Sequence, residues 1–155
     1  PGHSSAASDV YKRQRLNKIN FKKITKNYDF IVDGSDNFKT KFIINDLSLK
    51  FKKFLVTGAI SKFDGHIFTF DFTDKNTPCI RSFFQDDTIT DDILNCEYEG
   101  ILGTVAGIIG TIQANEILKK ILSIGQDLNG FILILDLLNL SFRKVKLKKL
   151  KNVPG

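Results

Sequence analysis

The stretch YDFIVDGSDNFKTKFIINDLSLKFKKFLVTGAI, residues 28–60, carries the strongest fold signal in the chain. It begins with a short apolar run at residues 28–33 and ends with another at residues 54–60, and both have the composition of buried strands. Between them, apolar residues recur at helical spacing from Phe38 to about Lys52, which is typical of an amphipathic helix. This order predicts a right-handed parallel βαβ unit, as in doubly wound α/β sheets.

The sequence after this unit predicts antiparallel strands. Asp64-Gly65 has the composition of a type I′ hairpin turn, and polar and apolar residues then alternate over residues 66–72. Residues 73–96 lack periodicity, so we expect a long loop with one short helical piece. The predicted fold class is therefore α/β, a mixed sheet with one parallel βαβ unit and antiparallel hairpins.

A second helix is predicted over residues 101–124, followed by an apolar strand at 131–136 and a lysine-edged partner strand at 141–150. The apolar residues of this helix include Ala114, Ile117, Leu118, Ile121 and Leu122. Glycines at positions 100, 103, 107 and 110 imply that another backbone or a ligand closely approaches its first turns. Close helix–sheet packing and phosphate binding both fit, although neither GxGxxG nor GxxxxGK[ST] is present.

Composition indicates one globular domain in a reducing compartment. The chain has 155 residues, of which 42% are hydrophobic and 26% charged, and its two cysteines exclude a disulfide scaffold. No apolar run reaches the roughly 18–20 residues of a membrane span, so we expect a cytoplasmic protein with no membrane partner. The net charge is +6, but basic residues at 143–151 alternate with Val145 and Leu147 as on an edge strand with one wet face. A nucleic-acid partner is therefore not expected.

The first residues do not fit this pattern. Residues 1–14, PGHSSAASDVYKRQ, are small and polar and resemble a translated cloning adapter. We interpret them as an artefactual or disordered leader, and residues 15–155 as part of a domain.

A candidate site follows the first predicted strand, at Asp33-Gly34-Ser35-Asp36-Asn37. Ligands of open α/β sheets collect at the carboxyl ends of strands and at helix N-termini. A carboxylate there can hold Mg²⁺ together with phosphate oxygens. The alternative is that Asp36 or Ser35 only caps the following helix.

Five blocks in order resemble the ThiF/MoeB-type adenylyltransferases, the bacterial relatives of ubiquitin-activating enzymes. DGSDN followed by KTKFIIND resembles the D-x-x-DN-x-x-[TR]-x-x-x-N block of that family. The resemblance continues through VTGAISKFDGHIFTF, TPCIRSFF, CEYEGILGTVAGIIGTIQANEILKKIL and GFILILDLLNLSFRKVKL, and it extends from Lys26 to the C-terminus. It implies the C-terminal half of a Rossmann-like domain, since the family's first βαβ unit, with its glycine-rich nucleotide loop, has no counterpart before Arg15.

The resemblance implies an enzyme that uses ATP and Mg²⁺ to adenylate the C-terminal glycine of a small ubiquitin-like sulfur carrier with a Gly-Gly tail. It also implies a homodimer and a role in molybdopterin or thiamine biosynthesis. Asp36 matches the aspartate of the Mg²⁺–ATP site, and Asn37 and Asn45 match polar positions near the nucleotide. Lys41 stands where the family has arginine, so the charge is kept but not the bidentate fork. Without the glycine-rich loop, we expect the fragment alone to be inactive.

Both cysteines are candidates for chemistry in this resemblance. Cys96 matches the family cysteine of the crossover loop, which takes part in sulfur transfer or forms a thioester; a buried apolar role is the alternative. Cys79 matches the start of a zinc-binding CxxC pair, but Ser82 replaces the second cysteine, so we expect no zinc.

Two other functions remain open. Half of a dinucleotide-binding oxidoreductase also fits a doubly wound sheet, but that class requires GxGxxG and an acidic residue about 20 residues later. A non-catalytic module that docks a carrier or another partner is the second alternative.

Overall fold

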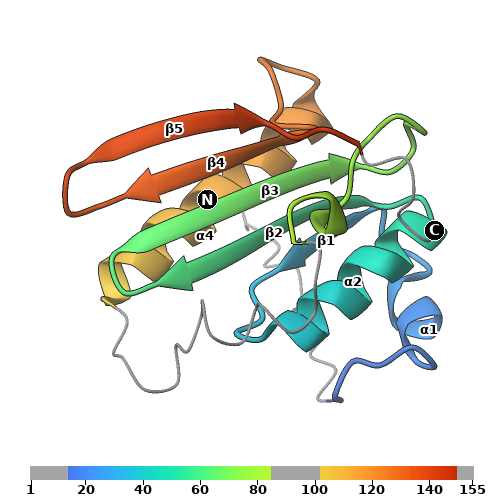
Figure 1. The fold of residues 1–155 in the computed structure, drawn as a ribbon. Coiled ribbons are helices and arrows are strands. Elements are labelled where there is room, and N and C mark those ends of the chain that lie inside the picture. Colours follow the sequence, from blue (N-terminus) through green and yellow to red (C-terminus); the bar gives the residue numbers. More distant parts are fainter. Residues whose placement is uncertain (1–13, 85–101, 150–155) are drawn as a thin grey trace, which may run out of the picture.

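The computed structural model describes residues 14–84 and 102–149, which form a five-stranded sheet with helices on both faces (Figure 1). The helices are α1 (Phe21–Thr25), α2 (Phe38–Lys50), the one-turn 3₁₀ helix η1 (Ile80–Ser82) and α4 (Gly103–Leu122). The strands are β1 (Phe30–Asp33), β2 (Phe54–Ser61), β3 (Asp64–Asp71), β4 (Phe131–Asp136) and β5 (Ser141–Lys146), in the spatial order β1-β2-β3-β4-β5. Among these residues, no helix has the length and apolar character that crossing a bilayer requires.

The predicted βαβ unit is confirmed. β1 pairs with β2 in parallel, with Asp33 opposite Thr57, and α2 connects the two strands. The prediction that β1 is fully buried is wrong, because β1 forms one edge of the described sheet and the side chain of Val32 is 54% exposed.

The strands divide the core into two layers because successive side chains point to opposite faces. On one face, α2 and η1 cover a phenylalanine-rich layer, in which the rings of Phe38 and Phe84 meet edge to face with their centroids 4.9 Å apart. On the other face, α4 packs on β2 and β3 through Val105 and Ile109. Figure 1 shows α2 and α4 on opposite sides of the sheet.

The β2–β3 hairpin forms as predicted, but its turn does not lie at Asp64-Gly65. Ser61 pairs with Asp64, so the turn residues are Lys62 and Phe63, and the backbone of Lys62 has a positive φ of 35°. Gly65 lies inside β3 because α4 passes directly over it: an added Cβ would come within 2.3 Å of Ile109 Cδ1. This glycine serves helix packing rather than the turn.

The glycines of α4 do not mediate close packing, contrary to one of the two predictions. A Cβ added at Gly103, Gly107 or Gly110 would meet nothing within 4 Å. The close approach is instead made possible by glycines of the sheet, Gly58 and Gly65, which lie under Ile109.

The buried face of α4 also differs from the predicted apolar stripe. Its buried residues are Val105, Ile109, Gln113 and Glu116, whereas Leu118, Ile121 and Leu122 are exposed. The buried polar side chains are tolerated because they bond to backbone groups; Glu116, for example, accepts a hydrogen bond from the Leu128 amide at 2.8 Å.

The end of the chain is a β4–β5 hairpin, as predicted, although β5 is shorter than the expected 141–150. β5 is an edge strand, but all six of its residues are exposed, so it has no dry face. η1 is the short helical piece expected within residues 73–96, and residues 85–96 of that predicted loop lie outside the described part of the chain.

Exchanging glycine for alanine should have opposite effects in the sheet and in the helix. Gly65→Ala should lower the free energy of unfolding by about 1–3 kcal/mol because the new methyl overlaps Ile109. Gly107→Ala should raise it by up to about 1 kcal/mol, since the site is open and alanine favours the helix. Urea denaturation measures both. Equal changes in the free energy of unfolding of the two variants would contradict the packing described here. Adding Ile109→Val to Gly65→Ala should recover part of the lost free energy of unfolding, because it removes the methyl group that lies closest to the new Cβ.

Candidate functional site

A cavity of about 290 Å³ lies at the carboxyl ends of β1 and β2, between the start of α2 and the first half of α4. The loop after β1 and the first residues of α2 form one wall, Gly58, Ala59 and Ile60 the second, and α4 the third. The lining residues of the loop and α2 are Gly34, Ser35, Asp36, Asn37, Phe38 and Lys41, and those of α4 are Ala106, Ile109, Gly110 and Gln113. The sequence predicted a site at this place in the sheet.

The loop after β1 is held by its own polar side chains. Asp33 Oδ1 accepts a hydrogen bond from the Ser35 amide at 2.8 Å. Asn37 is the N-cap of α2, and its Oδ1 accepts from the Thr40 amide at 2.9 Å. The alternative in which Asp36 or Ser35 caps the helix is therefore wrong, because Asn37 does so.

Asp36 is consequently available to a ligand. Its carboxylate is exposed at the cavity and accepts one side-chain hydrogen bond, from Asn37 Nδ2 at 3.0 Å. That bond, together with one from its own backbone N–H, lowers the pKa of Asp36 below its ordinary value. The carboxylate is thus ionised at neutral pH.

The residues present fit a Mg²⁺ ion that is brought by a phosphate. Within residues 14–84 and 102–149, no group of three or more His, Cys, Asp or Glu side chains could hold a metal ion. Mg²⁺ commonly takes only one or two carboxylates and completes its shell with water and phosphate oxygens, which Asp36 satisfies. In the same loop, Ser35 Oγ is buried without a hydrogen-bond partner, as expected of a donor that lacks its acceptor.

Lys41 lies in the cavity wall but its ammonium is directed inward. It is 3% exposed, and its Nζ is 3.3 Å from Asp33 Oδ2 and 2.5 Å from the Gly58 carbonyl oxygen. Thr57 Oγ1 donates to the same Asp33 oxygen at 2.5 Å. Lys41 therefore links α2 to the last residue of β1 and to the middle of β2, and these bonds support the loop after β1.

Gln113 fastens α4 to the same point, and sequence reasoning did not identify it. Its Nε2 donates to the Asp33 carbonyl at 2.9 Å and to the Val56 carbonyl at 3.3 Å. The one available signal was a glutamine within an otherwise apolar helical stretch. The carboxyl ends of β1 and β2 thus lie between two helices, each tied to them by a buried polar side chain.

The other predicted residues lie elsewhere. Asn45 is not among the cavity residues; its side chain is fully buried and accepts from the Ile80 amide at 3.1 Å. Cys79 is buried at the start of η1, where its side chain and that of Ser82 cap the turn reciprocally. Cys96 lies outside the described residues.

Comparison with known proteins identifies the family. The ThiF family model matches residues 6–154. The chain belongs to the ThiF family. The match begins at residue 6, within the segment 1–14 that is predicted to be an artefactual or disordered leader.

The relatives that the chain matches include proteins whose names describe them as adenylyltransferases. It is 35% identical over 143 residues to the sulfur carrier protein adenylyltransferase of Thermus thermophilus, covering 90% of this chain and 53% of the relative. It is 39% identical over 134 residues to a probable molybdopterin-synthase adenylyltransferase of Porphyra purpurea, covering 86% and 35%. It is 35% identical to the adenylyltransferase and sulfurtransferase MOCS3 of Drosophila grimshawi, covering 86% and 29%. The chain thus spans about half or less of the length of these relatives.

Solved structures confirm the predicted Rossmann-like fold. Escherichia coli MccB bound to MccA superposes with a TM-score of 0.71 over 91% of this chain and 43% of MccB, at 10% sequence identity. MccB with ATP gives a TM-score of 0.66 over 88% of this chain and 42% of MccB, at 13% identity. At such identities, the likeness concerns the fold alone.

Removing the buried ammonium should destabilise the protein strongly. Lys41→Met leaves the Asp33 carboxylate buried without its cation, which should lower the free energy of unfolding by about 3–5 kcal/mol. Adding Asp33→Asn removes the unpaired charge, so the double variant should lose less than the sum of the single losses. Urea denaturation of the four proteins gives the coupling energy, and Lys39→Met, an exposed change on the same helix, is the control. If the losses in the free energy of unfolding of the two single variants add up to that of the double variant, Lys41 and Asp33 do not stabilise the protein as a pair.

Proposed function

We propose that the complete protein to which this chain belongs uses Mg²⁺–ATP to adenylate the C-terminal carboxylate of a small ubiquitin-like sulfur carrier. The observation that carries the proposal is the ionised Asp36 carboxylate, which is exposed at a cavity at the strand ends of a ThiF-family domain. The names of the relatives support the reaction class, since an adenylyltransferase transfers AMP.

The proposed reaction requires this site to stabilise the negative charge that develops on pyrophosphate. The carrier carboxylate attacks the α-phosphorus of ATP, an acyl–phosphate bond forms, and the bond to pyrophosphate breaks. When bound, Mg²⁺ neutralises the charge that develops on the departing pyrophosphate. Asp36 would hold that ion at the cavity, and Asn37 would orient the Asp36 carboxylate. Lys41 and Gln113 would keep this loop fixed relative to both strands.

The described residues supply only part of such a site. A cavity of about 290 Å³ is at the lower end of the roughly 300–1,000 Å³ range of small-molecule sites. The edge of β1 and the outer apolar face of α4 are exposed, and the chain aligns with only 53% and 35% of the length of two of its relatives. We infer that other parts of the complete protein cover these surfaces and provide further nucleotide contacts. The chain alone would then bind ATP weakly.

The finer assignments are also proposals. The family resemblance supports a homodimer and a role in molybdopterin or thiamine biosynthesis, and the names of the relatives include both sulfur-carrier and molybdopterin-synthase adenylyltransferases. A cytoplasmic location is supported by the free thiol of the buried Cys79.

Loss of the Asp36 charge should reduce adenylation without unfolding the protein. In the complete protein, Asp36→Asn should lower kcat/KM for carrier-dependent ATP–pyrophosphate exchange about 100-fold, because one charge that holds the cation is lost. Asp29→Asn, an exposed carboxylate before β1, is the matched control and should leave exchange within twofold of wild type.

Two outcomes would contradict the proposal. Unchanged exchange in Asp36→Asn would remove Asp36 from the reaction. Absence of exchange in the wild-type complete protein, with carrier binding intact, would favour the non-catalytic docking module.

We propose Cys96 for the step after adenylation. Its thiolate would attack the acyl carbon of the adenylated carrier, so that a thioester forms and AMP leaves. Cys96→Ser should therefore leave ATP–pyrophosphate exchange within twofold of wild type and abolish the thiol-sensitive carrier adduct on a non-reducing gel. A thiol-sensitive adduct that persists in Cys96→Ser would show that Cys96 does not carry out this step.

A further inference from the structure

We propose that a second cavity, at the opposite end of the sheet from Asp36, binds a small organic molecule through its phosphate group. This cavity has a volume of about 640 Å³ and is called the distal cavity below. It lies between the loop that follows β3, the residues just before β4 and the segment that follows β5. Figure 1 shows β2 and β3 running in opposite directions, so the end of β3 lies far from the end of β2. The distal cavity shares no lining residue with the cavity at Asp36 and is therefore a separate site.

Hydrogen bonds between these three segments hold the distal cavity in shape. The Gly130 amide donates to the Thr69 carbonyl at 3.1 Å, and the Leu147 amide donates to the Gly130 carbonyl at 2.9 Å. The Lys149 ammonium donates to the Lys75 carbonyl, which joins the segment after β5 to the loop after β3. Because the walls are bonded to each other, the cavity is formed before any ligand binds.

Asn129 lines the distal cavity and has a hydrogen-bond donor available. Its Oδ1 accepts from the Asp71 amide at 2.8 Å, which fixes the orientation of the side chain. Its Nδ2 carries two hydrogens, and the one acceptor for them among the described residues is Thr77 Oγ1 at 3.3 Å. The Thr77 hydroxyl itself donates to the Asp71 carbonyl at 2.8 Å. One N–H of Asn129 is therefore left for a ligand.

Lysines at the end of β5 supply positive charge to the distal cavity. Lys146, Lys148 and Lys149 are lining residues. Lys146 and Lys148 are exposed, and neither forms an ion pair with a carboxylate of residues 14–84 or 102–149. Among the described lining residues, Asp74 alone is acidic, and its Oδ1 accepts from the Asn76 amide at 2.8 Å. Positive charge thus exceeds negative charge in the lining, which favours an anionic ligand.

The donors of the distal cavity fit a phosphate group better than a carboxylate. A phosphate monoester carries a charge of about −1.5 to −2 at pH 7 and offers three acceptor oxygens. Lysine binds phosphate as a point charge, whereas a planar carboxylate is matched best by the two-pronged guanidinium of arginine, and no described lining residue is arginine. The volume of about 640 Å³ lies within the roughly 300–1,000 Å³ range of small-molecule sites. This room favours an organic phosphate over the free ion.

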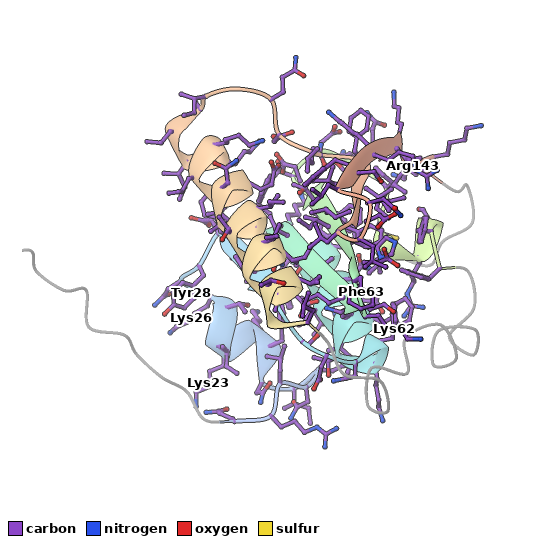
Figure 2. All side chains as sticks on the ribbon, turned by 90° about the vertical axis from the view of Figure 1, so that its left-hand side faces the viewer. Lys23, Lys26, Tyr28, Lys62, Phe63 and Arg143 are labelled. Atoms are coloured by element: carbon purple, nitrogen blue, oxygen red, sulfur yellow. The ribbon has the colours of Figure 1, made fainter. Side chains whose placement is uncertain are left out.

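Equilibrium dialysis of the complete protein with inorganic phosphate and with ribose 5-phosphate tests this site. Mg²⁺ is left out, so that no cation draws phosphate to the other cavity. The variant Lys146→Gln/Lys148→Gln removes two cations from the lining. The matched control Lys23→Gln/Lys26→Gln removes the same charge from exposed residues in and just after α1, which Figure 2 shows well apart from Arg143 of β5.

The wild-type protein should bind ribose 5-phosphate at one site per chain and more tightly than inorganic phosphate. Lys146→Gln/Lys148→Gln should raise the Kd for ribose 5-phosphate at least about tenfold, whereas the control should leave it within about twofold of wild type. Asn129→Asp keeps the acceptor for the Asp71 amide but replaces the N–H donors by a negative charge, so it should also raise this Kd at least about tenfold.

Four results would overturn the proposed phosphate site. They are the absence of saturable binding to the wild-type protein at millimolar ribose 5-phosphate, tighter binding of inorganic phosphate than of ribose 5-phosphate, an unchanged Kd in Asn129→Asp, and equal losses in Lys146→Gln/Lys148→Gln and its control. Equal losses would show that overall charge alone attracts the anion. None of these results bears on Asp36, so the proposed adenylation stands or falls separately.

Discussion

The ion pair between Asp33 and Lys41 is the constraint on which the site depends. Both side chains are buried, so neither charge is stabilised by water, and each requires the other together with further hydrogen bonds. Those bonds come from Thr57 on the neighbouring strand, the Gly58 carbonyl and the Ser35 amide. This ion pair thereby links the last residue of β1, the middle of β2, the loop before α2 and α2 itself. This arrangement fixes the position from which Asp36 faces the cavity.

α4 forms the third wall of the cavity, and its distance from the sheet determines where that wall lies. Gly58 and Gly65 lack a Cβ beneath Ile109, so the helix lies close to β2 and β3. Only at this distance can Gln113 reach the carbonyl groups of Asp33 and Val56. Sheet glycines and a buried glutamine therefore act together, the glycines by allowing the approach and the glutamine by donating to two backbone carbonyl groups.

The features that the sequence predicted depend on residues close together in the chain, whereas the features that it missed depend on contacts between residues far apart in the chain. The βαβ unit and the place of Asp36 follow from local periodicity and from the position of polar residues after a strand. The bonds of Gln113 join residues 80 and 57 positions apart, and no local pattern reports such partners. Gly65 was misplaced for the same reason: a glycine after an aspartate has the composition of a turn, and only the passage of α4 explains why it lies in a strand.

The capping of α2 shows how one side chain frees another for chemistry. Ser35, Asp36 and Asn37 are all residues that favour the N-cap position, so sequence alone left the capping residue open. Because Asn37 takes the cap through its Oδ1, its Nδ2 remains to hold the Asp36 carboxylate. The amide thus supplies an acceptor to the helix and a donor to the acid, which an ionised carboxylate in its place could not do, because it only accepts. The result is an ionised, oriented carboxylate that makes no bond on which the fold depends, which is what the proposed adenylation requires of a side chain that binds a cation.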